Sequence, residues 1–561
     1  MPFLDLPPEL IQRCLHELAI TDLARLLSVG NSYLTDLLLS SPTIRYRVQQ
    51  HIAGVYEPEH MTLTNATTPI ADRIKALQET EDRWLAFTPA SREALPLPAP
   101  WADVQGYTVG EGSYTVMYDM DMETLLGGRA STLSLGSGGT GWKELVTPKA
   151  MLDFQLCPAS DLFLRITHST LNDIQRFEVD CRTISTGVVH PLAAKNIVIA
   201  DIPLVYDLPD LSIEIAGSIL AIAFIFHYAP NDAAEQHNRL HVFDWMSGTK
   251  LMDPIPINTT AVTFLGPETL LAFDAEENAL SAIAIPRRDE RETIQQLKFE
   301  LPNLAPTHRI MPSAAVCGNG LWTPRSPRLP AAKSLQPLQR KLLFDDESSM
   351  FVLRYYILRS DVAADDEDGP GIDARIMVVA RRSEMLKLFQ QHAEPSNPEQ
   401  NQSPWVLPFA TWGPQSSRFL HLSTTFQNPC TSLAGQRLAS IDNKAPGQSA
   451  PIVIRDFNPG SVRRVRRLLR DSTSASASGS GSEGVELEGA YVHVVEADAD
   501  AAEDNWDFRS AALQDGGVKS KLAYVEVTSK ETFPFHAVHV SDECVVGDGA
   551  SQGEIEVMRF G

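Results

Sequence analysis

The chain has 561 residues, a hydrophobic content of 43% and a formal net charge of −24. This length predicts about two to four domains, and the composition is typical of an ordinary soluble protein. The acidic balance argues against nonspecific nucleic-acid binding, which needs a basic surface, and against attraction to anionic lipid; we expect neither as a partner.

Cysteine usage and hydropathy predict an intracellular protein. The six cysteines lie far apart and form no C-x-x-C motif, which fits a reducing compartment and provides no zinc framework. No basic segment followed by an apolar run opens the chain, so we expect no signal peptide. The apolar run at residues 219–226 is too short to cross a bilayer. We therefore expect a cytoplasmic and/or nuclear location, without a membrane partner.

The first 54 residues are expected to form three or four short amphipathic helices. In the first helix, Leu10, Cys14 and Leu18 recur four residues apart, and Ile11 and Leu15 form a second apolar stripe beside them. A second helix begins near residue 21 and ends near residue 30, and a third covers residues 33–38. A fourth helix begins after residue 41 and ends at residue 54.

These helices carry more apolar surface than about 50 residues can bury. The surplus face needs a partner, because each fully buried leucine contributes roughly 1.5–3 kcal/mol. Two interpretations follow from the pattern. The helices either pack as a cap on the rest of this chain or dock a second polypeptide.

The motif Leu6-Pro7-x-Glu9-Leu10, followed by Leu18, Asp22-Leu23, Leu26 and Val29, resembles an F-box. The resemblance covers roughly residues 4–50. It implies that the segment binds the Skp adaptor of a cullin-RING ubiquitin ligase. The residues that it assigns to this contact are Leu6, Pro7, Leu10, Ile11, Leu15, Leu18, Leu23, Leu26 and Val29.

Residues 55–99 are expected to join this module to the rest of the chain. A helix with Ile70, Ile74, Leu77, Trp84 and Leu85 on one face is predicted to end before residue 89. Prolines at positions 96, 98 and 100 then indicate a stiff, extended linker. We therefore place a domain boundary near residues 90–100.

From residue 100 onward, the pattern changes to short strands. An apolar strand followed by an alternating strand recurs, for example at residues 162–164 and 176–180, at 219–226 and 239–245, and at 270–273 and 280–285. Two units end in the same pattern: Asp180 is followed by Gly187, and Asp244 is followed by Gly248. This pattern suits a hairpin in which the Asp side chain bonds the backbone of the turn. Similar units recur to residue 527.

The fold class predicted is α+β and multidomain, with a small all-α module at residues 1–54 and a large all-β domain at residues 100–561. The unit spacing is close to that of propeller blades, and about 460 residues suffice for six to eight of them. The pattern resembles the WD-like propellers that serve as substrate receptors in many F-box proteins. The run that defines leucine-rich repeats does not occur.

Two insertions interrupt this pattern. The basic run at residues 463–470 leads into a Ser/Gly/Ala-rich stretch near residues 472–484, for which we expect disorder. The basic run is interpreted as the solvated flank of a strand or short helix, with a nuclear-localisation patch or a contact for an acidic substrate segment as alternatives. The acidic residues 365–371 fail the EF-hand template and are expected at a hairpin tip.

No catalytic residue and no cofactor or metal site can be assigned from the sequence. Residues 136–141 match G-x-G-x-x-G, but no clear β-α-β unit surrounds them. A P-loop needs a Lys directly after the last glycine, and Trp142 stands there instead. The histidines include no H-E-x-x-H motif. His536 and His539 are three residues apart and are expected on opposite faces of a strand.

The leading hypothesis is a non-enzymatic substrate-recognition adaptor of a Skp-cullin-F-box ubiquitin ligase. The helical module would hold the Skp adaptor, and the β domain would bind an unknown protein substrate. Two alternatives stay open. One is an F-box scaffold that acts outside ubiquitination. The other is a propeller enzyme or glycan-binding protein with a helical cap, which a cluster of carboxylates and histidines in a central channel would favour.

Overall fold

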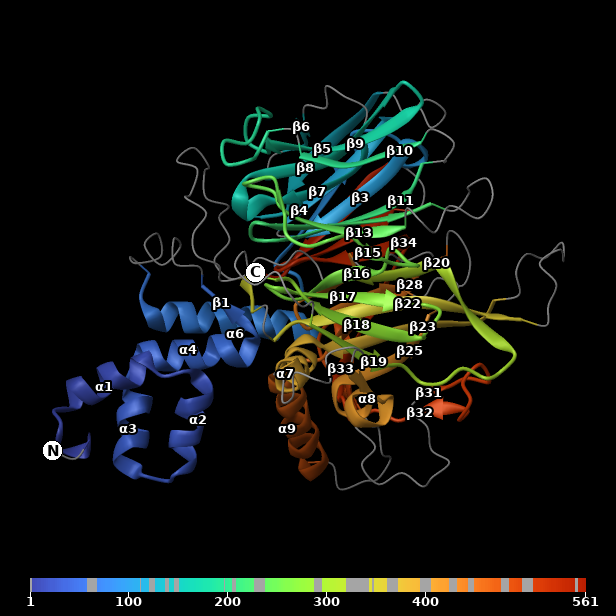
Figure 1. Ribbon diagram of the computed structural model, residues 1–561. Helices are drawn as coiled ribbons and strands as arrows, with labels where there is room; N and C mark the ends of the chain where they lie inside the picture. The colour runs from blue at the N-terminus through green and yellow to red at the C-terminus, as the bar shows by residue number, and fades with distance from the viewer. Residues whose placement is uncertain are drawn as a thin grey trace.

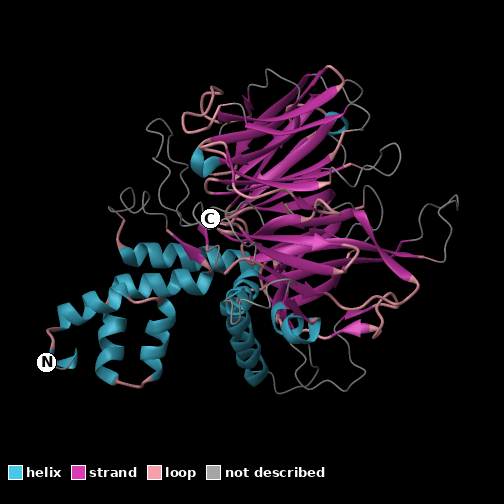
Figure 2. Cartoon of the chain, in the orientation of Figure 1, coloured by secondary structure: helices cyan, strands magenta, loops and turns pink. Residues whose placement is uncertain are grey.

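The structure is a computed structural model. It describes residues 3–57, 68–110, 112–120, 127–136, 141–145, 151–195, 197–203, 208–226, 238–286, 295–318, 343–345, 348–360, 372–393, 405–422, 431–441, 448–475, 484–496, 508–549 and 553–561. Figure 2 shows the two parts of the fold: a group of helices that projects at one side, and a large body of strands with further helices along its lower edge.

The N-terminal part consists of four short helices, which we call the helical module: α1 (Pro8–Glu17), α2 (Ile20–Ser28), α3 (Ser32–Ser40) and α4 (Pro42–Ala53). The single turn η1 (Phe3–Asp5) precedes them. Asn31 and Ser41 cap α3 and α4 by accepting the N–H of Leu34 and of Ile44. Gly54, with φ of 70°, ends α4. The predicted series of short helices is therefore confirmed.

The helical module projects from the side of the sheets, as the blue ribbons in Figure 1 show. After it, β1 (Val55–Tyr56) pairs with β21 (Leu343–Phe344). Helix α6 (Ile70–Ala86) then packs along α4. Its buried residues are Ile74, Leu77, Trp84 and Leu85, which lie on the apolar face that the sequence predicted.

Part of the expected linker at residues 55–99 is a strand of the sheets. Residues Ser91–Pro96 form strand β2, which pairs along its whole length with β36 (Glu554–Arg559) at the other end of the chain. A proline is tolerated at Pro96 because β2 lies at the edge of its sheet. A strand from before residue 100 thus completes a sheet formed by the C-terminal end of the chain.

Within the described residues, seven antiparallel sheets of four to six strands follow one another along the chain, and we call them together the sheet body. The first three sheets are β3 (Val104–Gly110), β4 (Ser113–Met120), β5 (Gly127–Ser134) and β6 (Lys143–Leu145); β7 (Met151–Cys157), β8 (Leu162–Leu171), β9 (Ile174–Thr183) and β10 (Ile197–Pro203); and β11 (Asp210–Ala216), β12 (Ile219–Ile225), β13 (Arg239–Asp244), β14 (Thr249–Lys250) and β15 (Ile255–Pro256).

The fourth and fifth sheets are β16 (Val262–Gly266), β17 (Thr269–Asp274), β18 (Ala279–Ala284), β19 (Gln296–Glu300) and β24 (Trp405–Leu407); and β20 (His308–Gly318), β22 (Met350–Arg359), β23 (Ile372–Arg381) and β25 (Ser417–His421). Strand β24 is the exception to the antiparallel order, because it runs parallel to β19. Helices α7 (Arg382–Ala393) and α8 (Phe409–Ser416) pack beside these sheets.

The sixth sheet is β26 (Leu433–Ala434), β27 (Arg437–Ile441), β28 (Ala450–Asp456), β33 (Tyr524–Phe533), β30 (Ala490–Val495) and β29 (Gly484–Glu486). Helix α9 (Pro459–Ala475) follows β28 and packs on this sheet. Strand β31 (Phe508–Arg509) pairs with β32 (Gly517–Val518) and contacts β25 of the fifth sheet. The seventh sheet is β34 (Phe535–Val540), β35 (Cys544–Gly549), β36 and β2.

The seven sheets contact one another in a closed succession. Strand β3 contacts β7, β7 contacts β11, β11 contacts β16, and β16 contacts β20; β22 then contacts β26, and β26 contacts β34. Strand β34 in turn contacts β3, so the last sheet meets the first. The chain is thus mostly β, as predicted, with its strands in several sheets and its helices at one side.

The predicted apolar and alternating strands are confirmed as hairpins of these sheets, such as β8–β9, β12–β13 and β17–β18. One predicted turn also has its expected bonds: Ser247 N–H donates to Asp244 Oδ1 at 2.8 Å, and Gly248 has φ of 72°. The other differs, because Asp180 binds Arg165 and Arg182 instead of the turn backbone.

The basic run at residues 463–470 lies inside α9, a helix of 17 residues, and not on a strand or a short helix. Residues 472–475 of the predicted disordered stretch continue this helix, and Gly484 begins β29. Residues 476–483, the acidic residues 365–371 and residues 137–140 of the glycine-rich motif lie outside the described residues.

Candidate partner-binding surface and its anchoring

Three of the nine residues assigned to partner binding are structural. Ile11 and Leu15 are fully buried and Leu23 is 1% exposed, in a cluster completed by Leu34, Leu38 and Ile44. A side chain with no exposed surface cannot contact a partner, so the assignment is corrected for these three. About half of the nine were expected to contact the partner and the rest to belong to the core of the module. The sequence could not tell which, because both apolar stripes of an amphipathic helix have the same period.

The other six assigned residues keep exposed surface. Leu10 is 48% exposed and Val29 is 72% exposed, and Pro7 is exposed as well. The half-buried residues that pack on the edge of the cluster are Leu6, Leu18 and Leu26. The cluster that holds them consists of residues of the helical module itself, so these leucines are not enclosed by the sheet body.

Further large apolar side chains of the helical module are exposed that the motif did not assign: Leu4, Leu27, Tyr33 and Leu39, with exposed fractions of 37–58%. Isolated exposed leucines are ordinary in soluble proteins, but a small module with this many is typical of an interaction site. Within the described residues, the helical module therefore has a surplus of uncovered apolar surface, as the pattern predicted.

The module has internal polar contacts that fix its helices. Arg47 on α4 donates to the carbonyl oxygen of Leu18 at 3.0 Å and also to that of His16. The Gln12 side chain donates to the carbonyl of Leu37 at 3.4 Å. These contacts hold the end of α1 against α4 and the middle of α1 against α3, so the exposed side chains are presented by a folded support.

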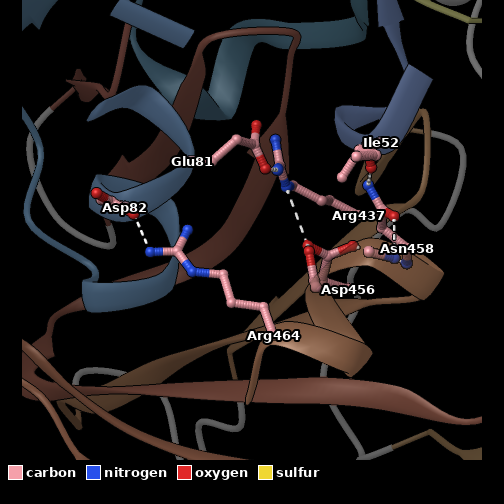
Figure 3. Close-up of polar contacts among 9 residues, drawn as sticks. Ile52, Glu81, Asp82, Arg437, Asp456, Asn458 and Arg464 are labelled. Atoms are coloured by element: carbon pink, nitrogen blue, oxygen red, sulfur yellow. Dashed lines mark hydrogen bonds and ion pairs between the residues drawn. The ribbon is translucent and has the colours of Figure 1, made fainter. Parts of the chain in front are cut away.

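A junction joins the module to the sheet body, where α4 and α6 meet α9 and the sixth sheet (Figure 3). Asn458 donates its Nδ2 hydrogen to the carbonyl of Ile52, the last turn of α4, at 2.8 Å. Gly460 lies so close to this turn that an added Cβ would be 2.7 Å from the same carbonyl oxygen. On the exposed side, Arg464 of α9 pairs with Asp82 of α6.

The centre of the junction is a buried charge cluster. Arg437 of β27, whose side chain is 4% exposed, binds Glu81 of α6 and lies 3.6 Å from Asp456 of β28. Burial raises the pKa of Glu81, against the opposing effect of the Arg437 guanidinium. Trp84 lies beneath the guanidinium and stacks at 4.0 Å on Phe560, next to the C-terminus. No sequence signal indicated this cluster, because its α6 residues and its sheet residues are hundreds of positions apart in the sequence.

A cavity of about 480 Å³ opens at the same junction. Its walls come from α4 and α6 on one side and from α9, β27, β28 and β33 on the other. The cavity is thus shared between the N-terminal helices and the sheet body.

The polar groups inside the sheet body form no metal site, as far as the structure describes the chain: no group of three His, Cys, Asp or Glu side chains could hold an ion. His539 and Asp548 contact each other at 2.7 Å, but both are at most 1% exposed, so a substrate has no access to them. Asp153 and Glu214 have raised pKa values, about 7 and about 8, because of burial.

Among the described residues, no helix combines the length and the hydropathy needed to cross a membrane. His536 and His539 both lie on β34; His536 is half-buried, with its ring 5.2 Å from that of Trp101, and His539 is fully buried.

Comparisons with known proteins find weak likenesses of fold. No family model and no curated protein matches the chain. The WD40 domain of SCAP from fission yeast is similar with a TM-score of 0.30 and 7% identity, over 78% of this chain and 98% of that one. An oligogalacturonate lyase in complex with manganese gives 0.27 and 9%, over the same shares of the two chains.

Hydrazine synthase from Kuenenia stuttgartiensis is similar with a TM-score of 0.22 and 12% identity, over 32% of this chain. The match spans about half (53%) of that protein's chain. At TM-scores of this size, none of the three likenesses bears on what the chain does.

Proposed function

We propose that the chain is a non-enzymatic adaptor of a Skp-cullin-F-box ubiquitin ligase. In this proposal the helical module binds a Skp-family adaptor, and the sheet body binds the protein to be ubiquitinated. The observation that carries it is the uncovered apolar surface of the helical module, which projects from the sheet body (Figure 1). The F-box-like motif of residues 6–29 supplies the identity of the partner.

The docking contact is assigned to the exposed and half-buried members of the motif. Leu10 and Val29 are the expected anchors, because they can lose the most apolar surface to a partner. The residues expected around them are Pro7, Leu6, Leu18 and Leu26. Ile11, Leu15 and Leu23 support this surface from beneath and take no direct part.

We further propose that the sheet body is a seven-bladed β-propeller. Two features support this: the closed succession of contacts from β3 to β34, and the completion of the seventh sheet by β2 from the N-terminal side. Closure of this kind protects the edges of the sheets and leaves the loops at both faces for binding. A WD-like substrate receptor of an F-box protein has the same general design.

The mechanism in this proposal is proximity. The adaptor raises the effective concentration of substrate lysines near a ubiquitin-conjugating enzyme that the cullin holds, and does no chemistry itself. The junction at Arg437 fixes the orientation of the helical module relative to the sheet body. The function requires a location in the cytoplasm or the nucleus, where the ligase would be assembled.

Co-expression with a Skp-family adaptor tests the docking step. Wild type is expected to co-elute with the adaptor in size exclusion, whereas Leu10→Asp and Val29→Asp should each lose co-elution. Leu171→Asp is the matched control, since Leu171 is 72% exposed on β8 of the sheet body. Co-elution of both module variants at the wild-type level would refute the proposed docking surface.

A second measurement separates ligase function from scaffolding. Proteins that the wild-type chain captures from cells serve as substrates. A complex of the wild-type chain with the Skp-family adaptor, the cullin and its RING partner should ubiquitinate them, whereas the same mixture with Val29→Asp should not. Adaptor binding without cullin recruitment would replace the ligase proposal with a scaffold outside ubiquitination.

A further inference from the structure

The junction cavity has an unusual distribution of hydrogen-bond donors. Helix α9 contributes Arg463, Arg464 and Arg467 to its wall, and α6 contributes Gln78 and Trp84. In a chain of net charge −24, three arginines on one cavity wall are a local concentration of positive charge. Some of these donors already have partners within the chain and others do not.

The carboxylates of the cavity are balanced by two of its arginines. Asp82 pairs with Arg464, and Glu81 and Asp456 both contact Arg437. Arg463 and Arg467, by contrast, are exposed, and within the described residues neither makes an ion pair or a side-chain hydrogen bond. They are four residues apart on α9, so their side chains lie on the same face of the helix.

Trp84 provides a second, independent observation. Its side chain is 3% exposed and lines the cavity, yet its Nε1–H has no hydrogen-bond partner in the part of the chain that the structure describes. A buried indole N–H usually finds an acceptor, because leaving a buried donor unsatisfied costs about 1–3 kcal/mol. Because Trp84 is part of the cavity wall, an acceptor bound in the cavity at the edge of this indole would satisfy the donor.

We propose that the junction cavity binds a small organic phosphate. Its phosphate groups would lie against Arg463 and Arg467, and an acceptor atom of its less polar body would take the Trp84 N–H. This site goes beyond the proposed adaptor function and does not depend on it. Guanidinium groups favour phosphate, since their planar forks match its oxygens and donate charge-assisted hydrogen bonds.

The cavity fits a small molecule better than a peptide. Its volume of about 480 Å³ lies within the range of roughly 300–1,000 Å³ that is usual for small-ligand sites. Apolar side chains line it beside the arginines, which suits a ligand with a charged end and an apolar or aromatic body. These side chains are Ile52, Leu77, Leu85, Ile454 and Val527.

A ligand in this cavity would contact both halves of the molecule. Arg463 and Arg467 lie on α9, which packs on the sheet body. Gln78 and Trp84 lie on α6, which packs on the helical module. A molecule that binds only the folded junction stabilises it, and the stabilisation grows with the logarithm of the free ligand concentration once this exceeds the Kd. Thermal unfolding is therefore a readout of binding that is independent of any ligase activity.

The test measures binding of ADP, inorganic pyrophosphate and adenosine to the full chain by calorimetry. ADP is expected to bind, pyrophosphate to bind more weakly and adenosine not to bind measurably. Arg463→Gln/Arg467→Gln should weaken ADP binding on the order of 10- to 100-fold. The charge-matched control is Arg466→Gln/Arg470→Gln on the same helix, because neither residue lines the cavity; it should bind ADP like wild type.

A second pair of variants removes no contact of the fold. Gln78 is exposed on the opposite wall, so Gln78→Glu should weaken ADP binding and Gln78→Lys should strengthen it. Absence of binding by all three compounds, or equal losses in the two arginine double variants, would overturn the proposal. Either result would leave the adaptor proposal intact, since that is tested by co-elution with the Skp-family adaptor.

Discussion

The guanidinium group of Arg437 lies 4.8 Å from the centre of the Trp84 ring, so that a cation of the sheet body covers the face of an indole on α6. The same guanidinium binds Glu81 and lies near Asp456. One buried cation thus holds α6 to the neighbouring strands β27 and β28, which follow it by more than 300 residues, and it connects the N-terminal helices to the sixth sheet.

Replacement of Arg437 should therefore destabilise the protein strongly. Arg437→Met leaves Glu81 and Asp456 without their counter-ion, and breaking a buried ion pair in this way costs about 3–5 kcal/mol. Chemical denaturation followed by intrinsic fluorescence measures the change. Arg92→Met is the control, because the ion pair of Arg92 with Glu531 is exposed and should contribute only about 0–1 kcal/mol. Equal losses in the two variants would contradict the role assigned to Arg437.

The elements of this fold could be predicted because their signals are local. The four-residue spacing in α6 and the alternation in β9 come from which face of each element is buried. The sequence could not separate Leu10 from Leu15, since both lie on the apolar side of α1 and only the packing of α3 and α4 decides which is covered. Contacts such as Glu81 with Arg437 depend on the closed arrangement of sheets, for which one sequence carries no local signal.

The alternate spacing of the prolines partly explains why the end of the expected linker forms a strand. Leu97 N–H donates to Gly553 O, so in the same register Leu95 and Glu93 occupy the hydrogen-bonded positions of β2 opposite β36. Pro96 falls at an alternate position, where its missing N–H would face away from β36, and its carbonyl accepts the Trp142 indole N–H instead. Prolines at every second residue are therefore compatible with an edge strand.

This alternation predicts that proline destabilises the protein at one of two neighbouring exposed residues of β2 and leaves its stability nearly unchanged at the other. Glu93→Pro removes a hydrogen bond of the ladder and should cost about 1–3 kcal/mol, whereas Ala94→Pro should be nearly neutral. Glu93→Ala controls for the ion pair of Glu93 with Arg559. Thermal unfolding of the three variants provides the measurement. A larger loss for Ala94→Pro than for Glu93→Pro would show that the register is wrong.

A buried hydrogen-bond chain joins the first sheet to the seventh and reaches the segment just before β26 of the sixth. Tyr114 Oη–H donates to Asp548 Oδ1 at 3.0 Å, His539 contacts the other carboxylate oxygen at 2.7 Å, and Thr431 contacts the second ring nitrogen of His539 at 2.7 Å. Burial and the Asp548 charge raise the pKa of Tyr114 well above its usual value. The phenol therefore stays a donor throughout the range in which the protein is handled.

Removal of this donor should destabilise the closed arrangement. Tyr114→Phe leaves a buried oxygen of Asp548 without its partner, at a cost of about 1–3 kcal/mol. Tyr118→Phe on the same strand is the control, because within the described residues the hydrogen-bond partner of the buried Tyr118 hydroxyl is the neutral Ser131 hydroxyl at 3.0 Å, and a smaller loss is expected. Denaturant midpoints measure both, and a loss for Tyr118→Phe at least as large would contradict the importance of the charged acceptor.

The raised pKa of Glu214 makes the free energy of unfolding depend on pH. It lies on β11, accepts a hydrogen bond from Thr263 at 3.4 Å, and interacts with the Arg382 charge, which opposes the effect of burial; burial prevails and raises its pKa to about 8. Between its ordinary pKa of 4.5 and this value, the folded protein holds a proton that the unfolded chain has released. The free energy of unfolding therefore falls as the pH rises through this window.

Glu214→Gln keeps the shape of the protonated side chain and removes its titration, so it should lose less stability than wild type between pH 5 and pH 9, by on the order of 2 kcal/mol. Asp253→Asn, at a fully exposed carboxylate of the same sheet body, should follow the wild-type curve. Urea unfolding at pH 5, 7 and 9 gives the three curves. A constant difference between Glu214→Gln and wild type across this range would mean that Glu214 is ionised in the folded protein throughout, and the burial argument for this carboxylate would fail.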